Sequence, residues 1–211
     1  IFETFGLPAG PQFNFGVVTG AQHDRFWFLT EAQDELIQFQ PDRLLHNWRK
    51  FGDRTNVYPR FESMIERFET ETAALDAYFF ALSGKNIRVN QCEISYINVI
   101  KLGQSSGLKE LSGWLNFVQP DPVDSDEASV GFRTTLIAND QPIGRLHCQV
   151  VPVLNAKNER AARVELTVRG VPSSEDVAAA VEFLTYGREM IVDTFAKMTT
   201  DSAHAFWGRI K

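Results

Sequence analysis

The stretch that decides the fold is residues 162–169, which read ARVELTVR. Apolar and polar residues alternate along it without a break, as Ala162, Val164, Leu166 and Val168 against Arg163, Glu165, Thr167 and Arg169. Because successive side chains of a β-strand point to opposite faces, this pattern predicts a strand with one dry face and one wet face. Such alternation is typical of an antiparallel sheet that is covered on one side only.

The same alternation extends to two other stretches. In residues 143–154 the dry positions are Leu146, Cys148, Val150 and Leu154, and the wet ones are Arg145, His147 and Gln149. In residues 87–102 the dry positions are Cys92, Ile94, Tyr96, Ile100 and Leu102, and the wet ones are Gln91, Glu93 and Ser95. Residues 130–138 complete a meander before the second long helix, with turn signals at 139–140 and 155–158. Residues 25–30, 35–40 and 43–49 predict an earlier meander, preceded by a weak strand at 12–19.

Two long amphipathic helices are predicted, over residues 58–82 and 174–198. The first carries an apolar stripe at Phe61, Ile65, Phe68, Leu75, Phe79 and Leu82, with Thr72 in the one gap. The second carries Val177, Val181, Leu184, Arg188, Ile191, Phe195 and Met198 at the same steps. We expect Ser173 or Ser174 to cap the second helix, Gly84 to end the first, and Phe68 and Leu184 to lie in the core.

These elements predict an α+β fold, in which a curved antiparallel sheet carries the two long helices on one face. We expect a single domain over residues 1–211, with a short helix at 107–117 and a loop at 119–128. The halves 1–84 and 85–211 resemble each other, because their helix stripes align at an offset of 116 residues. This similarity indicates either an internal duplication of a β-α-β-β-β-α unit or a coincidence between two ordinary amphipathic helices.

Composition narrows the class of protein. The chain has 211 residues, 44% of them hydrophobic, so it can bury a core, and no apolar run approaches the roughly 20 residues of a membrane span. A net charge of −6 argues against non-specific nucleic-acid binding. Residues 1–10 lack a signal-peptide pattern, and the two cysteines, Cys92 and Cys148, are too few for a disulfide framework. We therefore expect a cytoplasmic protein with no membrane association and two reduced, buried thiols.

Four ordered motifs carry a resemblance to a known family. They are QPDR with HNWR at 40–49, YPRFE at 58–62, NQCEISYIN at 90–98 and HAFWGR at 204–209. Together they resemble a sporadically distributed bacterial family that is described as uncharacterised. Members of that family usually begin with a strand of Pro-Pro and Val-Glu-Val type, which this sequence lacks. The resemblance implies a bacterial protein, but it implies no activity, substrate or cofactor.

The sequence contains no recognisable catalytic or metal-binding motif. Its four histidines never form an H-x-x-x-H pair, and C-x-x-C, G-x-S-x-G, P-loop and G-x-G-x-x-G patterns are missing. His147 and Cys148 are neighbours on a strand, so they point to opposite faces and cannot share a metal ion. We expect neither a metal ion nor a cofactor.

The candidate binding residues are mostly polar side chains of the wet face. They are Arg49, Gln91, Glu93, Arg145, His147, Arg163 and Arg169, joined by Arg188 and by the aromatic residues Trp48 and Trp207. Each has an ordinary alternative: cross-strand ion pairs for the wet face, a carboxylate partner or an extended position at the core edge for Arg188, and packing beneath loops for the tryptophans.

Three functions compete on this basis. The first is a non-catalytic binding or accessory module that presents its polar sheet face to a protein partner or a small anionic ligand. The second is an enzyme with an acid–base site at Glu93 and His147, which requires the two to converge in a pocket. The third is a nucleic-acid-binding module, which the acidic total charge disfavours. The oligomeric state is left open.

Overall fold

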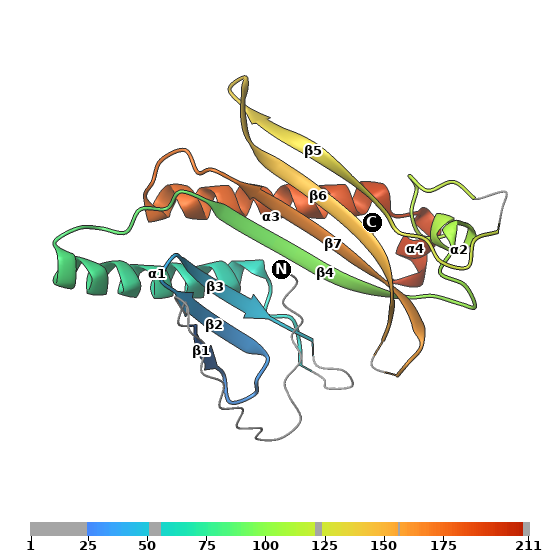
Figure 1. Ribbon diagram of the computed structural model, residues 1–211, viewed down its shortest axis with the longest axis horizontal. Helices are drawn as coiled ribbons and strands as arrows, with labels where there is room; N and C mark the ends of the chain where they lie inside the picture. The colour runs from blue at the N-terminus through green and yellow to red at the C-terminus, as the bar shows by residue number, and fades with distance from the viewer. Residues whose placement is uncertain (1–24, 51–55, 121–123, 156, 209–211) are drawn as a thin grey trace, which may run out of the picture. The chain divides into compact units, whose positions relative to one another are not determined.

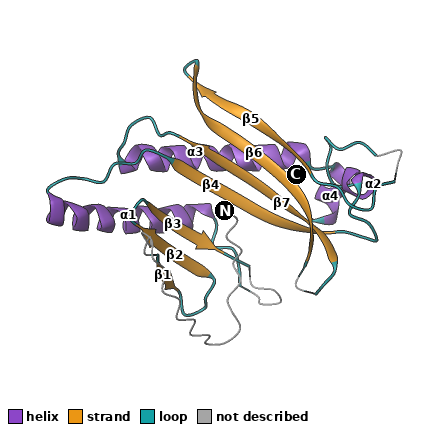
Figure 2. Ribbon diagram, in the orientation of Figure 1, coloured by secondary structure: helices purple, strands orange, loops and turns teal. Residues whose placement is uncertain are grey.

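The computed structural model describes residues 25–50, 56–120, 124–155 and 157–208, and in them the chain forms seven strands and four helices. The α+β class and the antiparallel pairing are confirmed. The strands form two sheets, where the sequence predicted one, with orders β1-β2-β3 and β4-β7-β6-β5 (Figures 1 and 2). Contacts divide the chain into two compact units, with the boundary in the sequence between Tyr58 and Pro59.

The first unit contains the predicted early meander. Its strands are β1 (Phe26–Leu29), β2 (Glu35–Gln40) and β3 (Arg43–Trp48), each antiparallel to the next. Burial alternates along β2, with Leu36, Gln38 and Gln40 buried. The strand expected at residues 12–19 lies outside the described residues.

The second unit is built on the four-stranded sheet. Its strands are β4 (Cys92–Lys101), β5 (Val130–Ala138), β6 (Gln141–Leu154) and β7 (Arg160–Gly170). The hairpin between β5 and β6 turns at Asn139 and Asp140, whose φ angles of 50° and 59° suit a two-residue turn. β4 is shorter than expected, because residues 87–91 lie outside the ladder.

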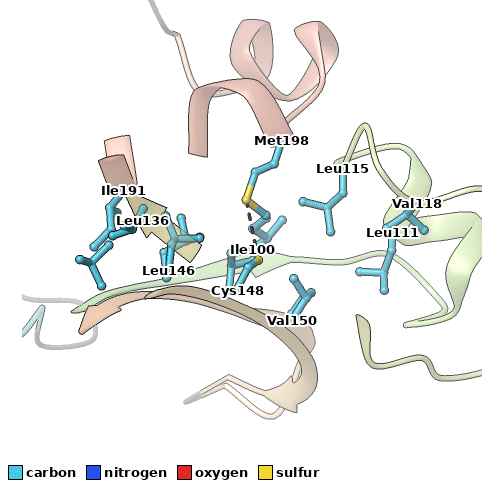
Figure 3. Close-up of a cluster of buried hydrophobic side chains, with 14 of the residues drawn as sticks. Ile100, Leu111, Leu115, Val118, Leu136, Leu146, Cys148, Val150, Ile191 and Met198 are labelled. Atoms are coloured by element: carbon cyan, nitrogen blue, oxygen red, sulfur yellow. Dashed lines mark hydrogen bonds between the residues drawn. The ribbon is translucent and has the colours of Figure 1, made fainter. Parts of the chain in front are cut away.

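One face of this sheet is dry, as the alternation predicted, and α3 (Val177–Met198) packs against it on β4 and β7. Buried side chains from β4, β6, β7 and α3 form a continuous core, part of which Figure 3 shows around Leu146, Cys148 and Met198. Gly187 allows close approach, because a Cβ atom there would lie 2.8 Å from Cγ2 of Ile94. Both cysteines are free and buried, which confirms that prediction, and burial raises the pKa of Cys92 to about 11 and that of Cys148 to about 12.

The helix α1 (Phe61–Ser83) packs against α3, and its apolar stripe is only partly covered. Phe68 is half-buried against the core, whereas Leu184 of α3 is buried. Phe79 and Leu82, expected on the covered stripe, are 42% and 70% exposed, and the one buried residue of α1 is Thr72. The reason is length, since the last turns of α1 extend past the beginning of α3 (Figure 1).

The ends of the long helices confirm one prediction and correct another. Gly84 ends α1 in the left-handed conformation, as expected. The cap of α3 is Asp176 rather than Ser173 or Ser174: its carboxylate accepts a 2.8 Å hydrogen bond from the amide of Ala179. Two short helices complete the unit, α2 (Leu108–Ser112) within the range predicted at 107–117 and α4 (Asp201–Phe206), which was not predicted. Within the described residues, no helix is both long and apolar enough to span a bilayer.

The order β4-α2-β5-β6-β7-α3 is the order expected for residues 85–211. The described part of the first half shows β1-β2-β3-α1. The internal duplication and the single-domain organisation stay predictions.

Candidate functional site

The candidate site is the face of the four-stranded sheet that points away from α3, called the outer face below. Residues directly opposite one another on paired strands share a face, so the register identifies its members. The polar row consists of Glu93 on β4, Arg169 on β7, Arg145 on β6 and Thr135 on β5. The next row consists of Ser95, Thr167, His147 and Arg133 in the same strand order. Alternation therefore predicted the side on which Glu93, Arg145, His147, Arg163 and Arg169 lie.

Three arginines of these two rows form what we call the arginine patch, namely Arg133, Arg145 and Arg169. Arg145 lies directly opposite Arg169, and Arg133 lies diagonally across from Arg145 on the neighbouring strand. Opposite residues on paired strands have Cβ atoms about 5 Å apart, and like charges at that separation destabilise the pair. The sheet thus holds three guanidinium groups together at an electrostatic cost.

Few carboxylates relieve this charge. Arg169 forms an ion pair with Glu93, its direct neighbour on β4. Arg133 and Arg145 are exposed, and neither forms a hydrogen bond or an ion pair with any residue in the described part of the chain. Two positive charges are therefore left uncompensated on this face of a chain whose net charge is −6.

The far half of the outer face has a different character. Arg163 pairs there with Glu165 on the same strand, at 2.7 Å between Nη2 and Oε2. The neighbouring positions of β4 are Ile97 and Val99, which are 53% and 58% exposed. Arg163 was expected in the same binding surface as Arg145. The structure instead gives it a carboxylate partner outside the arginine patch.

His147 lies within the arginine patch and is half-buried. Partial burial, followed by the positive charges of Arg133, Arg169 and Arg145, lowers its pKa below the ordinary value of 6.5, and Glu93 opposes the shift. Its direct neighbours are Thr167 on β7 and Arg133 on β5. The imidazole is therefore neutral at pH 7 in the free protein.

An open hollow of about 610 Å³ lies at the end of the outer face where β4 begins. Arg145, His147 and Arg169 line it, together with Asn90 and Gln91, which precede β4. The first residues of β6, Pro142–Gly144, and the last of β7 complete its wall. The hollow thus brings together four of the residues predicted from the sequence: Gln91, Arg145, His147 and Arg169.

The other predicted site residues lie elsewhere. Arg49 and Trp48 belong to the first unit, where Arg49 donates to the carbonyl oxygen of Gln33 at 3.2 Å and Trp48 contacts Tyr58 edge-on. Trp207 stacks with Trp114 and Phe195 near the C-terminal end of α3, with ring centroids 5.7 Å apart in both cases.

Arg188 also lies outside the hollow. Its guanidinium is 3.6 Å from Glu62 and lies over the ring of Phe61, so it joins α3 to α1. This is the carboxylate partner that the sequence offered as the ordinary alternative for Arg188.

The geometry does not assemble the acid–base pair of the enzyme hypothesis. Glu93 is on β4 and His147 on β6, with β7 between them, so their strands are roughly 10 Å apart. Glu93 is moreover occupied by Arg169. In the ranges that the structure describes, no three His, Cys, Asp or Glu side chains lie close enough together to hold a metal ion.

Arg133, Thr135 and Asn90 were not predicted from the sequence as members of this face. The signal for Arg133 and Thr135 was present, because residues 130–136 alternate in the same way as ARVELTVR and place Val130, Phe132 and Leu136 on the dry side. The structure confirms Leu136 as buried and Arg133 as exposed. Asn90 precedes the strand, where alternation gives no guidance.

Comparison of the chain with protein-family models, with curated proteins and with solved structures finds no match in any of the three.

Proposed function

We propose that this protein is a non-catalytic binding module of a bacterial cytoplasmic system, and that its arginine patch binds an acidic partner, either a protein surface or a small anionic ligand. The observation that carries the proposal is the pair Arg133 and Arg145. Both are exposed, and both lack a hydrogen bond or ion pair among the described residues. An acidic partner would supply the charges that the sheet itself does not provide.

The energetics favour a binding role over a purely structural one. A surface that only meets water gains nothing from placing Arg145 opposite Arg169, because like charges opposite each other destabilise a sheet. Desolvated arginines, by contrast, are among the strongest contributors to protein interfaces. Electrostatic complementarity also raises the rate at which an oppositely charged partner associates.

The same face offers little to nucleic acid. Proteins that bind single strands combine positive charge with aromatic platforms on which bases stack. Among the described positions of the outer face no residue is aromatic, since Tyr96 and Phe132 belong to the opposite side of their strands. The patch therefore suits a compact acidic group better than a polynucleotide.

The test is the double variant Arg133→Ala/Arg145→Ala, assayed with fluorescent poly-L-glutamate by anisotropy and with a bacterial lysate by affinity capture. The matched control is Arg88→Ala/Arg160→Ala, which removes two exposed arginines that pair with Glu175 and Glu127 elsewhere. We expect the patch variant to lose about tenfold or more in affinity for poly-L-glutamate, and the control to lose little. Added salt should weaken wild-type binding.

Equal binding by the two double variants would contradict the proposal. Thermal unfolding of both variants checks that neither loss reflects misfolding, since exposed substitutions of this kind change stability by only about 0.5 kcal/mol.

A further inference from the structure

The charges around the hollow determine which anion it suits. Arg145 and Arg169 line the hollow, whereas Arg133 and Glu93 lie beside it on the neighbouring strands. Together these four groups contribute three positive charges and one negative charge. The other polar residues of the lining, Asn90, Gln91 and Thr135, are neutral. The sum is two positive charges, which a dianion compensates and a single carboxylate does not.

The donors suit a tetrahedral oxyanion. Arg145 and Arg169 come from adjacent strands at directly opposite positions, so their guanidinium groups can approach one group from two sides. A guanidinium presents a planar fork of N–H donors that matches pairs of phosphate oxygens. Asn90 and Gln91, which also line the hollow, carry uncharged amide groups that can act as donors.

We propose that the hollow binds the dianionic phosphate group of a phosphate monoester between Arg145 and Arg169. This inference rests on the proposed function and narrows it, because that function requires only an acidic partner and does not specify the anion. The group could belong to a small metabolite or to a phosphorylated residue of a partner protein. The recognising chemistry is the same in both cases.

Proton uptake by His147 should accompany phosphate binding at this site. His147 is neutral at pH 7 because burial and the arginines of β5, β6 and β7 lower its pKa, with Glu93 of β4 acting in the opposite direction. The other groups that face it are the uncharged Thr167 of β7 and Gln149 of its own strand. Glu165 of β7 lies diagonally across on the same face, and its carboxylate pairs with Arg163. A bound dianion cancels the local positive charge and so raises the pKa of His147, which therefore takes up protons as phosphate binds.

The experiment is calorimetric titration of the full chain with inorganic phosphate, glucose 6-phosphate and a phosphoserine peptide near pH 7. Acetate and succinate serve as carboxylate controls, and two buffers of different ionisation enthalpy report proton uptake. We expect the phosphate probes to bind at least about tenfold more tightly than succinate. Because selective binding of the dianion releases protons from the monoanion in solution, the uptake at His147 is measured as the excess of protons taken up by wild type over His147→Gln. A preference among the three phosphate probes identifies the source of the group.

Three variants sharpen the test. Arg145→Gln should lose about tenfold or more in phosphate affinity, whereas Arg163→Gln, on the same face but paired with Glu165, should bind as wild type does. His147→Gln should keep binding at pH 7.5 but lose the proton uptake. Equal affinity for succinate and phosphate, or full phosphate binding by Arg145→Gln, would overturn the inference.

The two sets of experiments distinguish a failure of the phosphate inference from a failure of the proposed function. If phosphate fails to bind while poly-L-glutamate still requires Arg133 and Arg145, the phosphate inference is wrong and the binding module stands. If neither probe depends on these arginines, both are wrong.

Discussion

His147 makes the stability of the protein depend on pH in a direction that the structure fixes. Its pKa is lower in the folded chain than its ordinary value of 6.5 because of burial and the surrounding arginines. As the pH falls below that ordinary value, the unfolded chain binds a proton before the folded chain does. Folding stability contributed at this residue is therefore present above pH 6.5 and is lost as the pH falls toward the folded pKa.

The variant His147→Gln removes this dependence, so it should gain stability relative to wild type on going from pH 7.5 to pH 5.5. Urea unfolding of both proteins at the two pH values measures the difference, and the remaining histidines and carboxylates cancel in it. A difference that stays constant, or that moves in favour of wild type at low pH, would show that His147 is not held neutral by its neighbours.

At the scale of elements, the two long helices differ in how much of each is buried. Leu184 is buried in the core, whereas Leu82 of α1 is 70% exposed, although both occupy apolar stripes of the same spacing. Leu184→Ala should destabilise the protein by about 2–5 kcal/mol through lost burial and a cavity. Leu82→Ala should cost less than about 0.5 kcal/mol.

Chemical denaturation measures the free energy of unfolding of both variants. Because the substitution is Leu→Ala in each, the difference between the two losses reports the difference in burial. A similar loss in both would mean that the end of α1 is covered in solution. A negligible loss of stability for Leu184→Ala would show that this residue of α3 does not contribute to the core.

The same contrast shows what the sequence could predict. Alternation identified the strands and the two faces of the larger sheet, because a period of two residues is a direct consequence of strand geometry. Helical spacing placed α1 and α3 but could not say which stripe would be covered along its whole length, since that depends on where the neighbouring helix ends. Arg163 and Arg145 looked equivalent because both belong to the wet face, although the same alternation places Glu165 beside Arg163 and no carboxylate beside Arg145 on its own strand.

For the whole molecule, the distribution of the core between the two units decides what can fold alone. Every member of the buried apolar cluster, from Cys92 to Met198, lies after Pro59, and so do the helices that cover it. A fragment of residues 59–211 should therefore unfold cooperatively in denaturant, with a slope smaller than that of the full chain because less surface is exposed. Circular dichroism during urea unfolding measures both quantities.

A fragment that shows no cooperative transition would instead support the single domain that the sequence predicted. In that case the core of the larger sheet would need the first 58 residues in order to form.

The strand order of the larger sheet also sets the order in which the growing chain can complete it. Short turns join β5, β6 and β7, so those ladders form between neighbours in the sequence. β4 must wait, because its partner is β7 and Cys92 lies opposite Gly170. Closing so long a loop costs entropy that the two hairpins do not, which slows this last step. Until β7 leaves the ribosome, β4 is an unpaired strand that displays Cys92 and Ile100, which the folded protein buries. This is the interval in which the nascent protein is most exposed to aggregation and most in need of a chaperone.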